Sequence, residues 1–271
     1  MLMTVIGDES VKLRSWSLRV SDLISGNAAA IVVGLLILII WEVGARVFGL
    51  PSYIAPSPLQ VVEAFRENWY LLLTNIGPTM FEALLGFFVG NAVAIVFAIC
   101  FIHSRFAERA FYPLLVFFHT VPVLAIAPIL VLIFGNGIVP KILIASLICF
   151  FPMLVNMVRG LRDVSHGMLE LMRLMSATNS EIFWKVRVQS SLPYFFAALK
   201  ISSTTCVIGA IVAEWIGSSY GLGALIIDAT YNFKSALLYA VVFCSAMMAI
   251  LIFSIVTIAE RRLIFWRQAN G

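Results

Sequence analysis

Charged and turn-forming residues gather in one stretch, residues 170 to 193, which reads ELMRLMSATNSEIFWKVRVQSSLP. Apolar residues recur in it at helical spacing, which predicts two short amphipathic helices. Thr178 and Glu181 stand three residues apart, as in a capping box, so the second helix should begin near Thr178. We expect Pro193 to end that helix before the next apolar run. A helix of about two turns is too short to be stable alone in water. Held between two apolar runs, a short amphipathic helix of this kind is suited to docking in a groove of a partner.

Residues that could catalyse a reaction or bind a metal are scattered. No Gly-Lys pair occurs in the chain, and a P-loop ATPase requires one to hold its phosphates. The four cysteines form no CxxC pair and no cluster with histidine, so neither a metal site nor a disulfide framework is indicated. The three histidines, His103, His119 and His166, fall in different segments and leave no evident Ser/His/Asp arrangement. We expect a chain that is not an enzyme and binds no cofactor or metal.

The composition is that of a membrane protein. Hydrophobic residues make up 62% of the 271 positions and charged residues 12%, against about a quarter charged in soluble domains. The mean hydropathy is +1.02. The net charge of +4 is small, and we expect a lipid bilayer and no nucleic acid among the partners of the chain.

Six apolar runs match or approach the roughly 20 residues that cross a bilayer. We therefore predict an all-α, polytopic helical membrane protein with six transmembrane helices. Its transmembrane domain spans residues 28–258, between an N-terminal segment, 1–27, and a C-terminal tail, 259–271. The six runs lie at residues 28–48, 80–102, 113–134, 142–158, 197–216 and 237–258.

Basic residues predict the orientation, because cytoplasmic segments carry an excess of Lys and Arg. If the N-terminus is cytoplasmic, only four of the 18 basic residues fall on the opposite side, namely Arg46, Arg66, Lys141 and Lys234. Both termini and the loop at 162–196 should therefore face the cytoplasm. Residues 1–27 carry charges of both signs before any long apolar run, unlike a cleaved signal peptide.

Two segments on the opposite side are longer than simple connectors. Residues 49–79 contain a proline-rich turn followed by VVEAFRENWYLLL, which predicts an amphipathic helix on the membrane surface. Residues 217–236 carry three glycines and an apolar stretch, and we expect a short helix or a re-entrant piece there.

Polar residues inside the apolar runs are candidates for a translocation path, since such residues face an interior path or a partner helix. Roles other than lining a path stay open for these residues. Serine and threonine in membrane helices most often bond to their own backbone or allow close packing, and His119 could serve helix packing. Glu214 lies near the predicted interface, where water could hydrate it. The candidates are His119, Thr120, Ser203, Thr204 and Glu214, and the second run adds Glu82 and Asn91.

The stretch at 170–193 resembles the cytoplasmic EAA loop of bacterial ABC-importer permeases, E-A-A-x-x-x-G followed by I-x-L-P. Glu170 and the closing Leu192 and Pro193 match it at the right spacing. The chain departs from the pattern at residues 171 and 172, where alanines are usual, and at Ser176, where glycine is usual. Serine serves in a turn but adopts positive φ at a greater cost than glycine.

Further motifs are similar to the permease group for nitrate, sulfonate, taurine, riboflavin and thiamine-precursor pyrimidines. They are APSPLQVV at 55–62, FGNGIVPKI at 134–142, FFPMLVN at 150–156 and VAEWIGSSYGLG at 212–223. The resemblance implies the transmembrane-domain fold of a type I ABC importer in a bacterial inner membrane. It also implies a homodimer, two ATP-binding subunits that bind ATP and Mg, and a periplasmic or lipid-anchored substrate-binding protein.

In that family the short helix of the loop inserts into the ATPase subunit and couples its closure to the membrane helices. By resemblance, residues 177–183 would contact the ATPase, and Glu170 and Arg173 would brace the loop. The full set expected to act in coupling is Glu170, Arg173, Ser176, Ala177, Thr178, Asn179, Glu181, Phe183 and Pro193.

AEWIGSSYGLG at 213–223, followed by ATYNFK at 229–234, resembles the riboflavin and thiamine-precursor members more than the sulfonate members. This resemblance favours import of a riboflavin-like or thiamine-precursor pyrimidine compound. Taurine, an alkanesulfonate or nitrate is the alternative within the class. A secondary transporter is a further alternative, but ionisable residues near the predicted midplane, which ion coupling uses, are nearly absent. A membrane scaffold or channel subunit is another, although it would not need the loop pattern.

Overall fold

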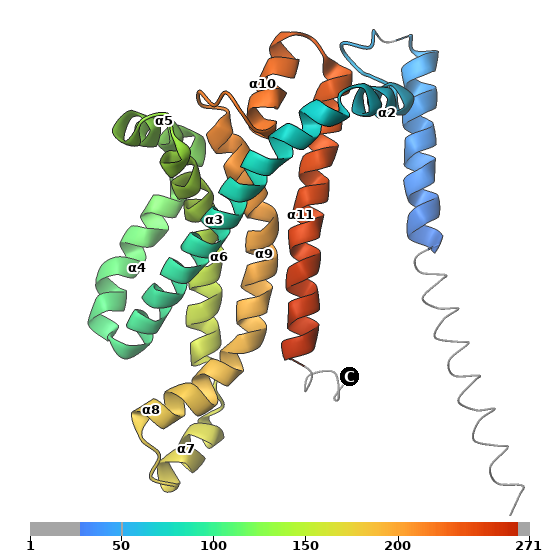
Figure 1. Ribbon diagram of the computed structural model, residues 1–271. Helices are drawn as coiled ribbons and strands as arrows, with labels where there is room; N and C mark the ends of the chain where they lie inside the picture. The colour runs from blue at the N-terminus through green and yellow to red at the C-terminus, as the bar shows by residue number, and fades with distance from the viewer. Residues whose placement is uncertain (1–27, 50, 265–271) are drawn as a thin grey trace, which may run out of the picture.

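The computed structural model describes residues 28–49 and 51–264, and these form helices and connecting turns (Figure 1). The predicted segment 1–27 and residues 265–271 of the predicted tail lie outside this range. A first helix spans Ala28–Val47. The rest are α2 (Pro58–Glu67), α3 (Trp69–His103), α4 (Arg105–Thr120), α5 (Val123–Phe134), α6 (Ile138–Arg162), α7 (His166–Leu174), α8 (Asn179–Ile182), a π-helical turn (Phe183–Arg187), α9 (Val188–Glu214), α10 (Leu222–Tyr231) and α11 (Ser235–Leu263).

Three long helices, α3, α6 and α9, pack together as the core of the bundle, and α11 covers α9. Small residues permit the close approach. A Cβ added at Gly90 on α3 would lie 2.9 Å from Ser146 Cα on α6, and one at Gly209 on α9 would lie 2.8 Å from Ala145 Cα. Lipid tails are as apolar as the side chains, so close packing of this kind holds membrane helices together.

The bundle has two distinct ends (Figure 1). The loop end carries α7 and α8, which project beyond the long helices. The far end carries α2 and α10, which cap the bundle on the opposite side. The first helix stands apart from the core, and its apolar stretch is 0% buried. It contacts the rest through a ring contact of Trp41 with Tyr239 and a hydrogen bond from the Leu59 N–H to Glu42.

Five helices among the described residues are long and apolar enough to cross a membrane, and α4 and α5 together would provide a sixth. The third expected run, 113–134, falls in α4 and α5, which meet at a bend of 100°. Val121 and Pro122 are both extended there, with ψ near 125°. Proline has no N–H and disfavours a helical conformation in the residue before it, so the helix breaks at this proline.

Other boundaries also differ from the sequence expectations. The second span begins at Trp69, not near residue 80, and it passes through Pro78. The predicted surface helix is therefore shorter and ends at Glu67, with WYLLL belonging to α3. It also begins earlier than the predicted sequence, at Pro58, after a capping box between Ser57 and Gln60. The short helix expected in 217–236 is α10.

Candidate docking loop and buried polar cluster

The loop end is built around a tightly fixed turn between α7 and α8. Ser176 adopts a positive φ of 55°. Its N–H donates to the Arg173 carbonyl, and the Ala177 N–H donates to the Met172 carbonyl, both at 2.9 Å. This is the Schellman arrangement that ends helices, in which glycine normally holds the left-handed position. The serine therefore adopts the backbone geometry of the glycine that it replaces.

The next helix begins where the capping box predicted. The Thr178 N–H donates to Glu181 Oε2 at 2.9 Å, and the Glu181 N–H donates to Thr178 Oγ1 at 3.3 Å. Lys185 pairs with the other carboxylate oxygen of Glu181 at 2.9 Å. Only residues 175–178 separate the last turn of α7 from the first of α8, so the two helices are joined with little freedom.

The loop is anchored to the long helices by its second half. Phe183 is buried and its ring lies 4.9 Å from the ring of His103 at the end of α3. Arg187 donates to the Leu161 carbonyl in the last turn of α6 at 2.9 Å. The expected stop at Pro193 was wrong, because the helix runs unbroken from Asn179 to Glu214. The π-helical turn just before this proline changes the hydrogen-bond spacing locally.

The tip of the loop presents large apolar side chains that nothing in the described chain covers. Leu174 is 84% exposed, Met175 70% and Trp184 64%. Ala177 between them is half-buried, and Asn179 is exposed. Exposed apolar groups on a rigid projecting element are typical of a protein-docking surface.

Glu170 and Arg173 lie on α7 and are exposed. Glu170 contacts His166 one turn earlier at 3.3 Å, in a pair whose side chains are largely accessible. Their bracing role stays a prediction about the assembled complex.

A buried polar cluster lies at the far end, where α3, α9 and α10 meet. Glu214 is 1% exposed. Its Oε1 accepts from Thr79 Oγ1 at 2.7 Å, and its Oε2 accepts from the Gly223 N–H at 2.6 Å. Thr79 in turn accepts from the Leu222 N–H at 2.8 Å. One carboxylate and one hydroxyl thus satisfy two of the free N–H groups that begin α10.

Close packing accompanies these bonds. Gly221 has a φ of 106°, and any Cβ there would overlap the Glu214 carboxylate. Within the sequence EWIGSSYGLG, Gly221 is therefore required because it has no Cβ and lets the backbone approach the buried Glu214 carboxylate.

A second carboxylate lies beside the first. Glu82 on α3 is 4% exposed and neighbours Glu214. Its Oε1 accepts from Lys141 Nζ on α6 at 2.8 Å, and Lys141 also donates to Ser218 Oγ. Glu82 Oε2 is buried without a hydrogen-bond partner among the described residues. Sequence reasoning missed Thr79 and Lys141, because their partners are distant in the chain and no local pattern marks them.

The candidate path residues do not form one surface of this chain. Ser203 is buried and bonds to the Lys200 carbonyl on its own helix. Thr204 is exposed and bonds to the Ile201 carbonyl. Thr120 is exposed and bonds to the Phe117 carbonyl, while His119 is exposed and stacks on Phe151 with ring centroids 3.9 Å apart. Their role in a path stays a prediction.

Comparison with known proteins decides the class. Residues 90–265 match the family described as binding-protein-dependent transport system inner membrane component. The chain belongs to this family. The match contains the docking loop and Glu214, whereas α2 and Thr79 precede it. The family is a transport component of the membrane, and the predicted class is confirmed.

Two curated relatives carry more specific names. The formylaminopyrimidine transport permease protein ThiX of Halalkalibacterium halodurans is 35% identical over 235 residues, which cover 86% of this permease and 94% of the relative. The riboflavin transport system permease protein RibX of Chloroflexus aurantiacus is 30% identical over 237 residues, covering 87% and 88%.

A solved structure shares the fold. A chain from the inward facing conformations of the MetNI methionine ABC transporter aligns with a TM-score of 0.63 at 18% identity. The alignment covers 72% of this permease and 97% of the MetNI chain. The expected transmembrane-domain fold of a type I ABC importer is confirmed.

Proposed function

We propose that this permease forms the translocation path of an ATP-driven importer, as one half of a homodimer. Two ATPase subunits, which bind ATP and Mg, dock at the loop end, and a soluble or lipid-anchored binding protein delivers substrate at the far end. The loop end and both termini face the cytoplasm of a bacterial inner membrane, in line with the distribution of basic residues.

The observation that carries this proposal is the geometry of the loop. Its two short helices are fixed by a Schellman turn and a capping box, and anchored on α3 and α6 through Phe183 and Arg187. A rigid element with uncovered apolar side chains is suited to insertion into a partner's groove. The chain has no P-loop, so the hydrolysis that drives transport belongs to that partner.

The dimer is supported by two helices, α4 and α5, that are largely uncovered within this chain. No residue of α4 is buried, and Leu132 on α5 is 87% exposed. Thr120 and Thr204 are exposed, so a second copy could enclose them in a shared path. Closure of the ATPase subunits on ATP would bring the two loops together and open the path toward the binding protein, and hydrolysis would reset it.

Affinity purification of the tagged permease from its native host, in mild detergent, tests the docking assignment. We expect an ATPase subunit to copurify with the unmodified chain. Ala177→Asp should abolish this, because it introduces a charge at the centre of the exposed apolar tip. Ser219→Asp adds the same charge to an exposed position at the far end and should leave the ATPase bound. A permease that purifies alone in all three preparations would favour a secondary transporter.

We propose a riboflavin-like or pyrimidine compound as the substrate, on the strength of the two relatives' names. In such systems the binding protein selects the ligand, so the test uses the complete assembly. In proteoliposomes that contain the copurified ATPase and the binding protein, riboflavin or an aminopyrimidine should stimulate ATP hydrolysis and taurine should not. Stimulation by taurine, an alkanesulfonate or nitrate alone would select the alternative within the class.

A further inference from the structure

A basic pocket lies at the loop end, beside the segment that anchors the docking loop and away from its exposed tip. Its volume is about 500 Å³. Arg105 and Arg109 contribute from the first turns of α4, Arg162 from the end of α6 and Arg187 from the π-helical turn, and Phe101 and Ile102 on α3 form an apolar side. The pocket therefore collects arginines from three separate segments of the chain.

The charges in this pocket do not cancel. Glu108 is the single acidic residue that lines it, and its Oε2 pairs with Arg162 Nη2 at 2.5 Å. Arg187 is engaged by the Leu161 carbonyl. Arg105 and Arg109 are exposed and have no ion-pair partner among the described residues, although both lie near enough to Glu108 to act on it electrostatically. The guanidinium groups of Arg105 and Arg109 are therefore available to bind an anion, and the Arg162 side chain is partly exposed beside them.

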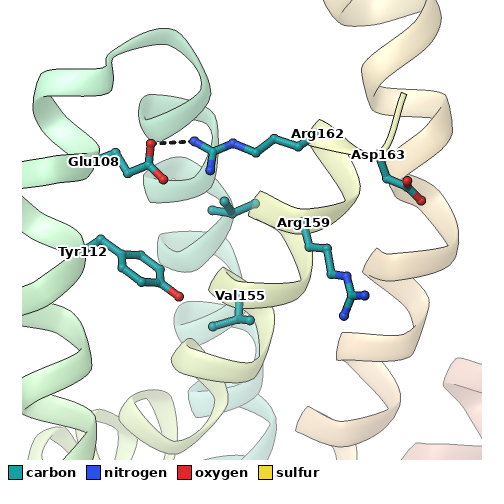
Figure 2. Close-up of a pocket in the computed structure, with 7 residues that line it drawn as sticks. Glu108, Tyr112, Val155, Arg159, Arg162 and Asp163 are labelled. Atoms are coloured by element: carbon teal, nitrogen blue, oxygen red, sulfur yellow. Dashed lines mark hydrogen bonds and ion pairs between the residues drawn. The ribbon is translucent and has the colours of Figure 1, made fainter. Parts of the chain in front are cut away.

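A neighbouring cavity of about 520 Å³ lies on the other side of the same ion pair and provides a contrast. Figure 2 shows Arg162 reaching from α6 across to Glu108, whereas Arg159 points away from that pair. Arg159 and Arg162 are matched there by Glu108 and Asp163, with Tyr112 and two valines completing the lining. This cavity is electrically balanced, so the excess positive charge is confined to the arginine side.

The position of the basic pocket suits the surface of a bilayer. The turn between α3 and α4 ends level with the loop-end termini of α6 and α11, and α7 and α8 extend beyond it (Figure 1). Phe106, next to Arg105, is 81% exposed, and further along α4 Phe117 and Phe118 are 63% and 60% exposed. Arginines followed along one helix by uncovered aromatic rings match the polar headgroup and the acyl chains of a lipid.

We propose that Arg105, Arg109, Arg162 and Arg187 form a binding site for the phosphate of an anionic phospholipid in the leaflet at the loop end. Guanidinium groups bind phosphate oxygens in a bidentate manner. A bound lipid would bridge α4 to α6 and the π-helical turn, with its phosphate beside the ion pair of Glu108 with Arg162. The site needs neither an ATPase nor a substrate, so it can be tested independently of the proposed transport function.

The test measures lipid binding to the purified permease in detergent by native mass spectrometry, titrating phosphatidylglycerol against phosphatidylcholine. We expect selective binding of phosphatidylglycerol. Arg105→Gln/Arg109→Gln should weaken it about 25-fold, at about fivefold for each charge near the membrane surface. Arg261→Gln/Arg262→Gln removes two exposed charges from the last turn of α11 and should have little effect. Glu108→Gln should strengthen binding about fivefold, because it removes the acid from the pocket.

Three results would overturn the proposal. Equal losses in both double variants would indicate general attraction to a basic surface, and unchanged binding in the Arg105 and Arg109 variant would place the lipid elsewhere. Inorganic phosphate that displaces phosphatidylglycerol at similar concentrations would make the pocket a site for a free anion. Both arginines are exposed, so their replacement should leave the fold intact, and a melting temperature equal to that of the unmodified permease checks this.

Discussion

Thr79 on α3 and Glu214 at the end of α9 are 135 positions apart in the chain, and the threonine hydroxyl donates to the carboxylate at 2.7 Å. Together they hold the first N–H groups of α10 through Leu222 and Gly223. This pair therefore determines how the far end of the bundle is closed, although neither residue lies in the loop that resembles the family pattern most clearly.

Replacement of Thr79 by valine should destabilise the permease. The change keeps the shape but leaves the Leu222 N–H and one Glu214 oxygen without the hydroxyl, at a cost of roughly 1 to 3 kcal/mol. Thr204→Val is the matched control, because that exposed hydroxyl bonds only to a carbonyl of its own helix. Melting temperatures in detergent compare the two. Equal shifts would mean that the buried bond contributes no more than a surface one.

Replacement of Gly90 by alanine should loosen the contact of α3 with α6. The added Cβ would overlap the Ser146 backbone, and overpacking of this kind costs about 1 to 3 kcal/mol. At Gly167 on α7 nothing lies within 4 Å of an added Cβ, so alanine there should stabilise its helix by up to about 1 kcal/mol. Urea or thermal denaturation should give opposite signs for the two variants, and the same sign for both would contradict the packing argument.

The left-handed turn at Ser176 predicts a ranking of substitutions. Glycine should be tolerated or stabilising, since it adopts positive φ without a Cβ penalty. Valine should destabilise the turn by about 1 to 2 kcal/mol, because β-branched residues are strained there. Hydrogen exchange of residues 171–178 measures the effect directly. Ser180→Val, at an exposed position inside α8, should leave that exchange nearly unchanged, so similar exchange in the two valine variants would argue against strain at the turn.

Cysteine labelling can separate path residues from packing residues. In a Cys100→Ser background, which removes the exposed native thiol, we expect a water-soluble maleimide to modify Thr204→Cys and not Ser203→Cys. Thr204 is open in the single chain and would face water in a dimeric path, whereas Ser203 is 0% exposed. Protection of Thr204→Cys by transported substrate would support the path. Labelling of neither residue would place Thr204 against lipid or the second copy.

Features that depend on residues close together in the sequence were predicted correctly, whereas contacts between residues far apart in the sequence were not. The capping box at Thr178 and Glu181 depends on residues three positions apart, so it was correctly predicted. Pro113, Pro122 and Pro128 look alike as a pattern, yet only Pro122 breaks the span, whereas α4 passes through Pro113 and α5 through Pro128. The sequence alone does not distinguish a proline that breaks a helix from one that the helix accommodates. The same limitation applies to the second span, where the helix passes through Pro78 and begins earlier than the apolar run suggested.

The polar cluster illustrates the same limit at long range. Glu214 was noticed as an acid in an apolar run, but the open alternatives were a path residue or a hydrated carboxylate. Its buried role depends on Thr79 and on the turn before α10, which only the folded chain brings together. Glu82 was also noticed, whereas its partner Lys141 on α6 was assigned only to an external segment by charge counting.

The helix that joins the two sites is a single piece of 36 residues, from Asn179 to Glu214. Its α9 part has 27 residues, roughly 40 Å at about 1.5 Å per residue, and ends at the buried carboxylate, whereas α8 turns away from α9 at the loop end (Figure 1). Because the chain stays helical from the tip to Glu214, a displacement of the tip that tilts α9 would strain the hydrogen bonds around this carboxylate. The π-helical turn lies between α8 and α9, so a substitution there would change how much of the motion of the tip reaches the far end.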